Sequence, residues 1–155
     1  LAMVYCSAVD LNGSKGAHWD THGDGFNRLK RDLLPPLDQA FSALLTDLKQ
    51  RGLFDDTLVV LLTEFGRTPK ISNGGGRDHY PNCYTVAYAG AGVSQGLLYG
   101  SSDKTGAFPA SQPVSPPDLH ATIFHALGID PNFTLHDQEN RPLAASDGKV
   151  LPIFA

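Results

Sequence analysis

The sequence is short of the residues that mark several large classes of protein. Its two cysteines, Cys6 and Cys83, are too few for a disulfide scaffold and do not form a Cys-x-x-Cys pair. No apolar run approaches the ~20 residues that a membrane-spanning helix needs. Twelve Lys and Arg against sixteen Asp and Glu give a formal net charge of -4, whereas a nucleic-acid-binding surface needs clustered basic residues. We therefore expect no disulfide framework, no membrane span and no nucleic-acid partner.

What is present suits a single folded unit. A length of 155 residues with 41% hydrophobic residues is enough for one domain over residues 1–155. The chain opens at Leu1 directly into an apolar stretch, with no leader visible, so we expect it to be the C-terminal portion of a larger domain. A truncated sheet would expose an edge, and we expect the missing N-terminal part of the same protein, or a second chain, to cover it.

Hydrophobic spacing predicts alternating strands and helices in the first half. Residues 2–9 form a short apolar run that predicts a buried strand. Apolar residues then recur every three or four positions over 29–48, which predicts an amphipathic helix. Pro35 and Pro36 fit the first turn of that helix, and Gly52 fits its end.

The second half continues the same alternation. The run 57–63 is almost entirely apolar, which predicts a central strand covered on both faces. A further strand is expected at 84–90. Ser115 and Asp118 match a capping box, which predicts a helix that ends near Gly128. Helices alternating with apolar strands are typical of α/β proteins, so we expect a mostly parallel sheet flanked by helices.

Three polar clusters follow predicted strands, at the edge where α/β sheets bind ligands. Their chemically active members are Asp20, His22, Glu64, Arg67, Arg77, Asp78 and His79. Carboxylate oxygen and neutral imidazole nitrogen suit Zn²⁺, Mn²⁺ or Fe²⁺, whereas Ca²⁺ prefers oxygen ligands alone. The clusters therefore predict a divalent metal site, with zinc favoured and manganese, iron or calcium as alternatives.

Each cluster also has a simpler interpretation. Asp20 stands near two glycines and can form an Asx turn. Glu64 can pair with Arg67, and Asp78 can pair with its neighbour Arg77 at the surface. One polar cluster at a strand end is common and three are not, so the joint placement favours a metal or anion site.

The order of the motifs WDTH, VVLLTEFGRTP, GGGRDHYP and SPPDLHATIFHALGI resembles the alkaline phosphatase/sulfatase superfamily. More closely, it resembles the C-terminal part of a sulfatase-like bacterial family that has no assigned function. The resemblance covers the chain from residue 3 onward. It implies an alkaline phosphatase-like α/β fold, a two-metal site at the carboxyl ends of a mostly parallel sheet, and an exported or periplasmic protein.

The resemblance also implies a ligand set. Carried over motif by motif, Asp20, His22 and His79 would bind one metal ion. The segment VVLLTEFG occupies the place where the superfamily carries an Asp-His pair. Glu64 can replace the acid of that pair, but Phe65 cannot replace the histidine, which puts the second metal in doubt.

The remaining polar residues receive roles by the same comparison. Arg67 and Arg77 become candidates to hold an anionic ester, since a planar guanidinium binds phosphate or sulfate oxygens in pairs. Asp78 is expected to orient His79 or a bound water. The function expected is metal-dependent hydrolysis of a phosphate or sulfate ester, on a small molecule or a polysaccharide.

A noncatalytic alternative stays open. The superfamily's nucleophile comes from an N-terminal region that has no counterpart here, and neither cysteine stands in the Cys-x-Pro-x-Arg context that sulfatases modify. Together with Phe65, this favours a metal-stabilised binding domain with a degenerate active site as the second interpretation.

Overall fold

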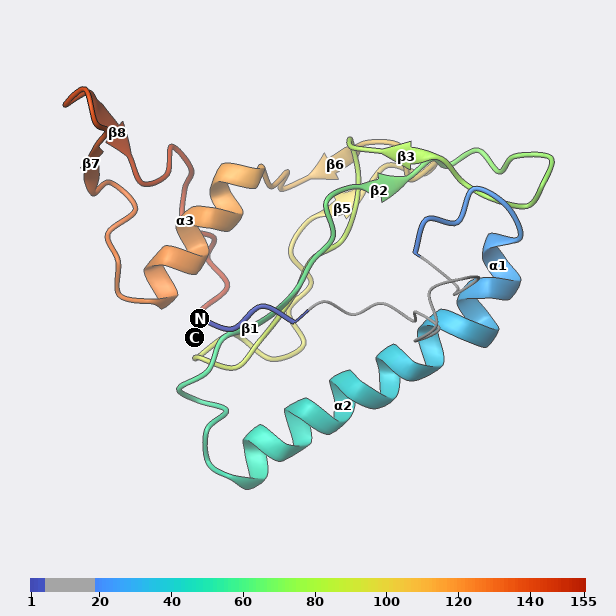
Figure 1. Cartoon of the computed structure of the whole chain (residues 1–155), viewed down its shortest axis with the longest axis horizontal. Coiled ribbons are helices and arrows are strands. Elements are labelled where there is room, and N and C mark those ends of the chain that lie inside the picture. The colour runs from blue at the N-terminus through green and yellow to red at the C-terminus, as the bar shows by residue number, and fades with distance from the viewer. Residues whose placement is uncertain (5–18) are drawn as a thin grey trace.

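The computed structural model describes residues 1–4 and 19–155, and Figure 1 shows how their helices and strands are arranged. The helices are α1 (Gly25–Arg28), the π-helix η1 (Leu29–Leu33), α2 (Leu34–Gln50) and α3 (Pro116–Ala126). The strands are β1 (Val59–Leu61), β2 (Gly66–Arg67), β3 (His79–Tyr80), β4 (Ala87–Ala89), β5 (Ser101–Ser102), β6 (Pro109–Ser111), β7 (Thr134–His136) and β8 (Pro142–Ala144). Most of the strand expected at 2–9, with Cys6, lies outside the described residues.

The strands form four separate two-stranded sheets, β1–β4, β2–β3, β5–β6 and β7–β8. All four pairs are antiparallel. The expected α/β class, with a mostly parallel, alkaline phosphatase-like sheet flanked by helices, is therefore wrong for the part of the chain that the structure describes. Parallel neighbours need a crossover connection, and none of these pairs has that geometry.

The apolar run at 57–63 explains why the prediction failed. Only Val59–Leu61 forms a strand, and its three residues are half-buried rather than covered on both faces. Its partner β4 pairs in the opposite direction, with Val60 opposite Tyr88. An unbroken apolar run indicates burial, but it does not specify the direction of the strand beside it. The strand expected at 84–90 is present as the shorter β4.

The amphipathic helix expected over 29–48 is confirmed, and it forms a continuous helical segment with α1 and η1. Pro35 and Pro36 fall in the first turn of α2, as predicted. A proline inside a helix removes a donor, and its ring collides with the carbonyl four residues earlier. The wider π turn of η1 immediately precedes them, and the Leu34 N–H bonds to the Leu29 carbonyl. Gly52 follows the helix at φ 68°.

Helix α3 begins with the predicted capping box. The Ser115 hydroxyl accepts from the Asp118 N–H, and the Asp118 carboxylate accepts from the Ser115 N–H. One turn later, the Thr122 hydroxyl donates to the Asp118 carbonyl at 2.6 Å and accepts from the Leu151 N–H at 3.0 Å. Thr122 is fully buried, so α3 is tied to the C-terminal segment by satisfied polar contacts within the core.

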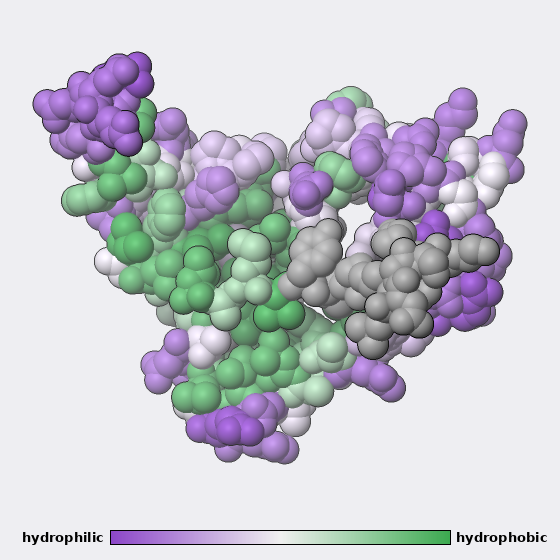
Figure 2. All heavy atoms as spheres, viewed as in Figure 1, coloured by the Kyte–Doolittle hydropathy of each residue, from purple (hydrophilic) through white to green (hydrophobic). Residues whose placement is uncertain are grey.

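The core formed by the described residues is small. Its buried hydrophobic residues are Leu33, Ala121, Leu151 and Ile153. The accessible surface of 11271 Å² exceeds the about 7600 Å² expected of a compact monomer of this size. Figure 2 shows apolar side chains gathered over the centre and left of one face, around β1 and α3, with polar residues at the β7–β8 hairpin.

Helix α2 contributes to this exposed apolar surface, because it has no buried residue along its 17 positions. An open, largely apolar groove runs between it and β1, lined by Leu34, Pro35, Leu37, Asp38, Phe41 and Leu61. None of the helices in the described part of the chain is both long and apolar enough to cross a bilayer.

Candidate metal centre

Two glycine-rich loops, 19–25 and 72–77, meet backbone to backbone. Gly23 and Gly75 form an isolated β-bridge. Beside it, the Asp24 N–H donates to the Gly74 carbonyl at 2.8 Å and the Gly25 N–H to the Gly75 carbonyl at 3.0 Å. These bonds join two segments about fifty residues apart in sequence, and they fix the start of α1 against the second loop.

Gly76 makes this close approach possible. A Cβ atom at Gly76 would lie 2.0 Å from the carbonyl carbon and oxygen of His22, closer than real Cβ contacts. Next to it, the Arg77 N–H donates to the Thr21 carbonyl at 3.2 Å. The side chain of Thr21 is buried, at 5% exposure. The glycine run 74–76, which the sequence indicates only as a loop, therefore packs against the backbone of His22.

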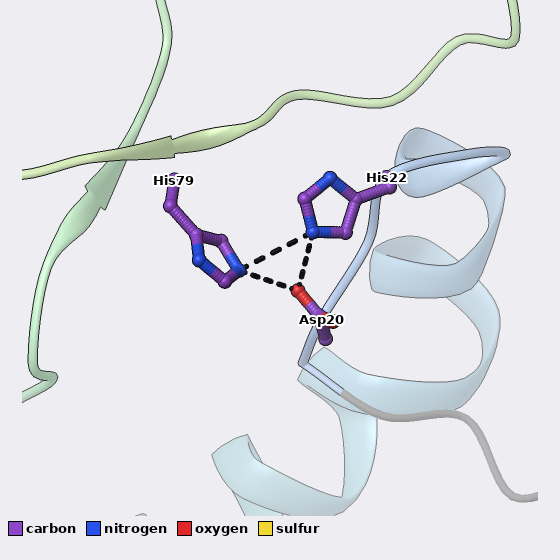
Figure 3. A group of neighbouring side chains, drawn as sticks. All are labelled: Asp20, His22 and His79. Carbon is purple, nitrogen blue, oxygen red and sulfur yellow. Dashed lines mark hydrogen bonds and ion pairs between the residues drawn. The ribbon is translucent and has the colours of Figure 1, made fainter.

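The β2–β3 hairpin brings the third functional side chain to the same place. Arg67 pairs with His79, and Gly66 with Tyr80. A Cβ atom at Gly66 would lie 2.1 Å from the Cys83 carbonyl oxygen, so the hairpin also depends on a glycine at a close backbone approach. His79 projects from β3 toward the loop that carries Asp20 and His22 (Figure 3).

Asp20, His22 and His79 converge on one point (Figure 3). The Asp20 Oδ1 atom lies 2.8 Å from His22 Nε2 and 2.7 Å from His79 Nε2. The two Nε2 atoms are 3.3 Å apart. All three side chains are about half exposed, at 58%, 47% and 48%. The structure thus brings together three side chains from two distant segments, with their ligand atoms facing each other and solvent.

Two neighbours support the imidazole rings. The Asp78 Oδ1 atom lies 2.7 Å from His22 Nδ1, so Asp78 supports His22, whereas the sequence predicted that it orients His79 or a bound water. The Phe65 ring packs against His79, with centroids 4.2 Å apart and planes tilted by 30°. Phe65, which interrupts the expected Asp-His pair, therefore forms part of the wall behind His79.

The hydrogen-bond pattern leaves a position for a cation. In the tautomer whose Nδ1–H donates to Asp78, the His22 ring presents a lone pair at Nε2. That lone pair faces the Asp20 carboxylate at 2.8 Å. Two facing lone pairs repel each other, so a positive centre, either a proton or a metal ion, belongs between them. A carboxylate bound to the far nitrogen of an imidazole is also the usual support of a metal-binding histidine.

The Asp20 carboxylate is strongly acidic. Its hydrogen bond with His79, followed by the hydrogen bond from Arg67, lowers the pKa of Asp20 from 3.8 to about 2 despite partial desolvation. The group is therefore ionised at neutral pH and supplies one negative ligand atom.

One of the three separations matches a small tetrahedral ion, and the two that involve Asp20 are shorter. Bonds of 2.0–2.2 Å to zinc place adjacent ligand atoms about 3.4 Å apart. The two imidazole nitrogens already have this separation, at 3.3 Å. Asp20 Oδ1 would need to retreat by about 0.6 Å, which is within the reach of an exposed carboxylate. The described residues thus supply one carboxylate and two imidazoles that are open to solvent.

The other expected site residues lie differently. Glu64 is exposed and is not among the described residues whose ligand atoms cluster. Arg67 donates from Nη1 to the Arg77 carbonyl at 3.0 Å and from Nη2 to the Trp19 carbonyl at 2.7 Å and Asp20 Oδ1 at 3.2 Å. Arg77 donates to the Thr68 and Arg67 carbonyls. Both guanidinium groups are thus engaged with protein oxygens, and their role in holding an ester stays a prediction.

Three contacts of the site cannot be predicted from the sequence. They are the close approach of Gly76 to His22, the packing of Phe65 against His79, and the contact of Asp78 with His22. No periodicity could have found these contacts, since each depends on how two loops cross. The one available signal was the glycine triplet, because three glycines together often mark a close backbone approach.

The chain is thus an α- and β-containing protein with an Asp-His-His cluster, whose helices and antiparallel strand pairs surround the loops that carry the cluster. A family model matches residues 4–153, and the chain belongs to that family, described as a protein of unknown function (DUF1501). No curated protein and no solved structure matches the chain. Nothing in these comparisons links it to the alkaline phosphatase/sulfatase superfamily.

Proposed function

We propose that the chain carries a divalent metal centre of a hydrolase acting on phosphate or sulfate esters. The single observation that carries the metal site is the convergence of Asp20, His22 and His79, whose ligand atoms all lie within 4.8 Å of one another. The donor set favours Zn²⁺, with Mn²⁺ and Fe²⁺ as alternatives. The reaction class comes from the resemblance of the motif order to the alkaline phosphatase/sulfatase superfamily.

The chain's own residues would prepare the site for this reaction. Asp20 supplies negative charge, and Asp78 holds His22 with its Nε2 atom turned inward. Phe65 packs behind His79 and limits its rotation. When bound, a metal ion would polarise the ester oxygen and lower the pKa of a bound water. Hydrolysis would add that water across the ester bond, releasing an alcohol and a phosphate or sulfate ion.

Exposure of the cluster supports an external substrate over a purely structural metal. Structural zinc sites are closed by four protein ligands, whereas catalytic sites keep one position open. Among the described residues, three protein ligand atoms are found, and each side chain is about half exposed. The accessible fourth position would admit either water or the oxygen of a substrate, including an ester on a polysaccharide.

A metal-stabilised binding domain is the second candidate, because one observation favours it. The Phe65 ring lies beside His79, on the chain position where the superfamily pattern would carry a second histidine. A centre limited to one metal, with no nucleophilic side chain assigned, could bind an anionic group without cleaving it. The two candidates share the metal site and differ in turnover.

Metal content tests the shared part. Purified chain is loaded with Zn²⁺, dialysed and measured for bound metal beside Asp20→Ala and His79→Ala. The control is His136→Ala, which removes an exposed histidine on β7. We expect about one zinc per wild-type and control chain, and a large loss in both cluster variants. Unchanged metal content in both would refute the site.

Turnover separates the two candidates. The zinc-loaded chain is assayed with an aryl phosphate and an aryl sulfate, with the Asp20→Ala protein as the blank. Hydrolysis above the blank supports the hydrolase. Tight zinc binding with no hydrolysis of either ester, but with measurable binding of phosphate or sulfate, supports the binding domain.

A further inference from the structure

Arg67 and Arg77 form a reciprocal clamp across the base of the β2–β3 hairpin, which carries His79. They stand on opposite sides of the β2–β3 hairpin, and each guanidinium donates to the main-chain carbonyl of the other. Arg67 Nη1 lies 3.0 Å from the Arg77 oxygen, and Arg77 Nη2 lies 3.1 Å from the Arg67 oxygen. Arg77 Nε also donates to the Thr68 carbonyl. The planar, forked shape of guanidinium allows one side chain to serve several carbonyls.

The clamp extends to the first loop through Arg67. Its Nη2 atom donates to the Trp19 carbonyl at 2.7 Å and to Asp20 Oδ1 at 3.2 Å. The Arg77 backbone N–H completes the connection with a 3.2 Å bond to the Thr21 carbonyl. Loop 19–22 is therefore held against the hairpin on both sides of Asp20.

The location of Arg67 makes it the structural link between Asp20 and His79. In the hairpin register, Arg67 lies directly opposite His79. Its side chain is 21% exposed, whereas the Asp20 side chain that it contacts is 58% exposed. A half-buried guanidinium thus contacts an exposed carboxylate.

We propose that Arg67 is a positioning residue that sets the separation between Asp20 and His79, with Arg77 as its reciprocal support. Neither guanidinium is assigned to the ester. This inference rests on the proposed metal site, and it replaces the expectation that the two arginines grip an anion. In the described part of the chain, Arg67 makes three hydrogen bonds to protein oxygens and Arg77 makes two, and these bonds already fix both side chains.

Cobalt(II) binding to the full chain tests the proposal, because the visible absorption of Co²⁺ reports ligand geometry. The variants are Arg67→Met, which keeps the length and removes all donors, and Arg67→Lys, which keeps the charge and removes the fork. Arg51→Met is the matched control, since Arg51 pairs with Asp47 on the surface of α2. Affinity for Co²⁺, the absorption spectrum and the affinity of the loaded protein for inorganic phosphate are measured for each.

We expect Arg67→Met and Arg67→Lys to weaken Co²⁺ binding by about 10- to 100-fold, the usual effect of removing a group that orients a metal ligand. The absorption bands should shift in both, and Arg51→Met should match the wild type. Unchanged Co²⁺ affinity and spectrum in Arg67→Met would overturn the clamp. So would selective loss of phosphate binding that Arg67→Lys restores, because lysine can replace arginine as a point charge for phosphate.

A metal-free measurement separates this inference from the proposed function. Amide exchange at Arg77 and the imidazole ¹⁵N shifts of His22 and His79 are recorded by NMR in the same variants without metal. Arg67→Met should speed exchange of the Arg77 amide, which donates to Thr21, and should move both imidazole signals. If the wild type binds no Co²⁺ but these changes occur, the metal function fails and the clamp stands. If neither the amide nor the imidazoles respond, the clamp fails whatever the metal result.

Discussion

The cluster formed by the two glycine-rich loops differs sharply from the α3 region, although both are rich in polar contacts. Around α3, the Thr122 hydroxyl is completely buried and bonds to two main-chain groups, so its polarity serves the fold. In the loop cluster, Asp20, His22 and His79 are about half exposed, and their polar atoms face each other. The backbone beneath them is nevertheless held closely by glycine contacts and by Arg67.

This difference shows where function can reside. A buried polar group that is fully satisfied rigidifies a core. Exposed polar side chains that the underlying backbone holds in place lose conformational entropy on folding. They contribute little to the free energy of folding. Exposed polar side chains that are already held in place suit ligand binding, because a ligand would interact with the polar atoms that face solvent. Five predictions test whether the two regions divide in this way, beginning with the largest effect.

Replacement of Gly76 by alanine should disrupt the loop cluster most. The added Cβ would meet the His22 backbone at 2.0 Å, so one loop must move, at a cost of about 3 kcal/mol or more. Zinc binding should be lost while α3 stays folded. Gly74→Ala is the control, because its Cβ would lie 3.9 Å from Gly23, an ordinary contact. Zinc affinity is measured by calorimetric titration of both variants. Equal zinc affinity of Gly76→Ala and Gly74→Ala would refute the role of Gly76.

Asp78→Asn should weaken the cluster without unfolding it. The change removes the charge that faces His22 Nδ1 at 2.7 Å, and loss of such a partner lowers metal affinity by about 10- to 100-fold. Asp55→Asn, an exposed position after α2, is the control. Zinc affinity is measured by competition with a chelator, and thermal unfolding of the apo chain should be unchanged. A drop in stability with unaltered affinity would assign Asp78 to the fold instead.

Thr122→Val should act in the opposite way, on stability alone. The isosteric change leaves the Leu151 N–H without its acceptor in a buried setting, which costs about 1–3 kcal/mol. The control Thr46→Val removes a hydroxyl that donates to the Ser42 carbonyl on an exposed face of α2, as the Thr122 hydroxyl donates to the Asp118 carbonyl. That control should change stability by less than about 0.5 kcal/mol. Urea unfolding measures both, and similar values would contradict the comparison.

Ser115→Ala should produce a smaller loss in the same region. It removes the hydroxyl that accepts the Asp118 N–H at the start of α3, and loss of such a cap typically costs about 1 kcal/mol. Ser42→Ala, within α2, provides the control. We expect the unfolding midpoint of Ser115→Ala to fall and its zinc affinity to stay at the wild-type value. An effect on zinc would show that the two regions are coupled.

Acid should produce the mildest effect. Hydrogen bonds from the Lys149 N–H and then from Ser115 hold the pKa of Asp118 below its usual 3.8. Because the folded pKa is lowered, the stabilisation is complete well above pH 3.8 and is lost as the pH falls through the folded value. The thermal unfolding midpoint of Asp118→Asn should therefore be lower than that of the wild type at pH 6. The difference between the two midpoints should shrink as the pH falls toward 2.5. A constant difference would mean that the charge of Asp118 contributes nothing.

Local sequence patterns were sufficient to predict the helices but not to predict how the strands pair. The capping box at Ser115 and Asp118 spans three residues, so its geometry is set within one helical turn. The prolines at the start of α2 restrict the chain in the same local way. Strand partners are chosen over longer distances, and the apolar run around β1 was consistent with either direction of pairing. The parallel sheet was inferred from that run, and the antiparallel β4 overturned it.

The sequence by itself determined the residue types of the candidate site and the helices on either side, because ligand chemistry and helix capping depend on side chains close along the chain. Only the tertiary structure decided that Asp20 and His79, 59 positions apart, share one point, and that Asp78 supports His22. The reason is steric. Two backbones can cross this closely only where Gly76 has no side chain, and the guanidinium of Arg67 then ties them together.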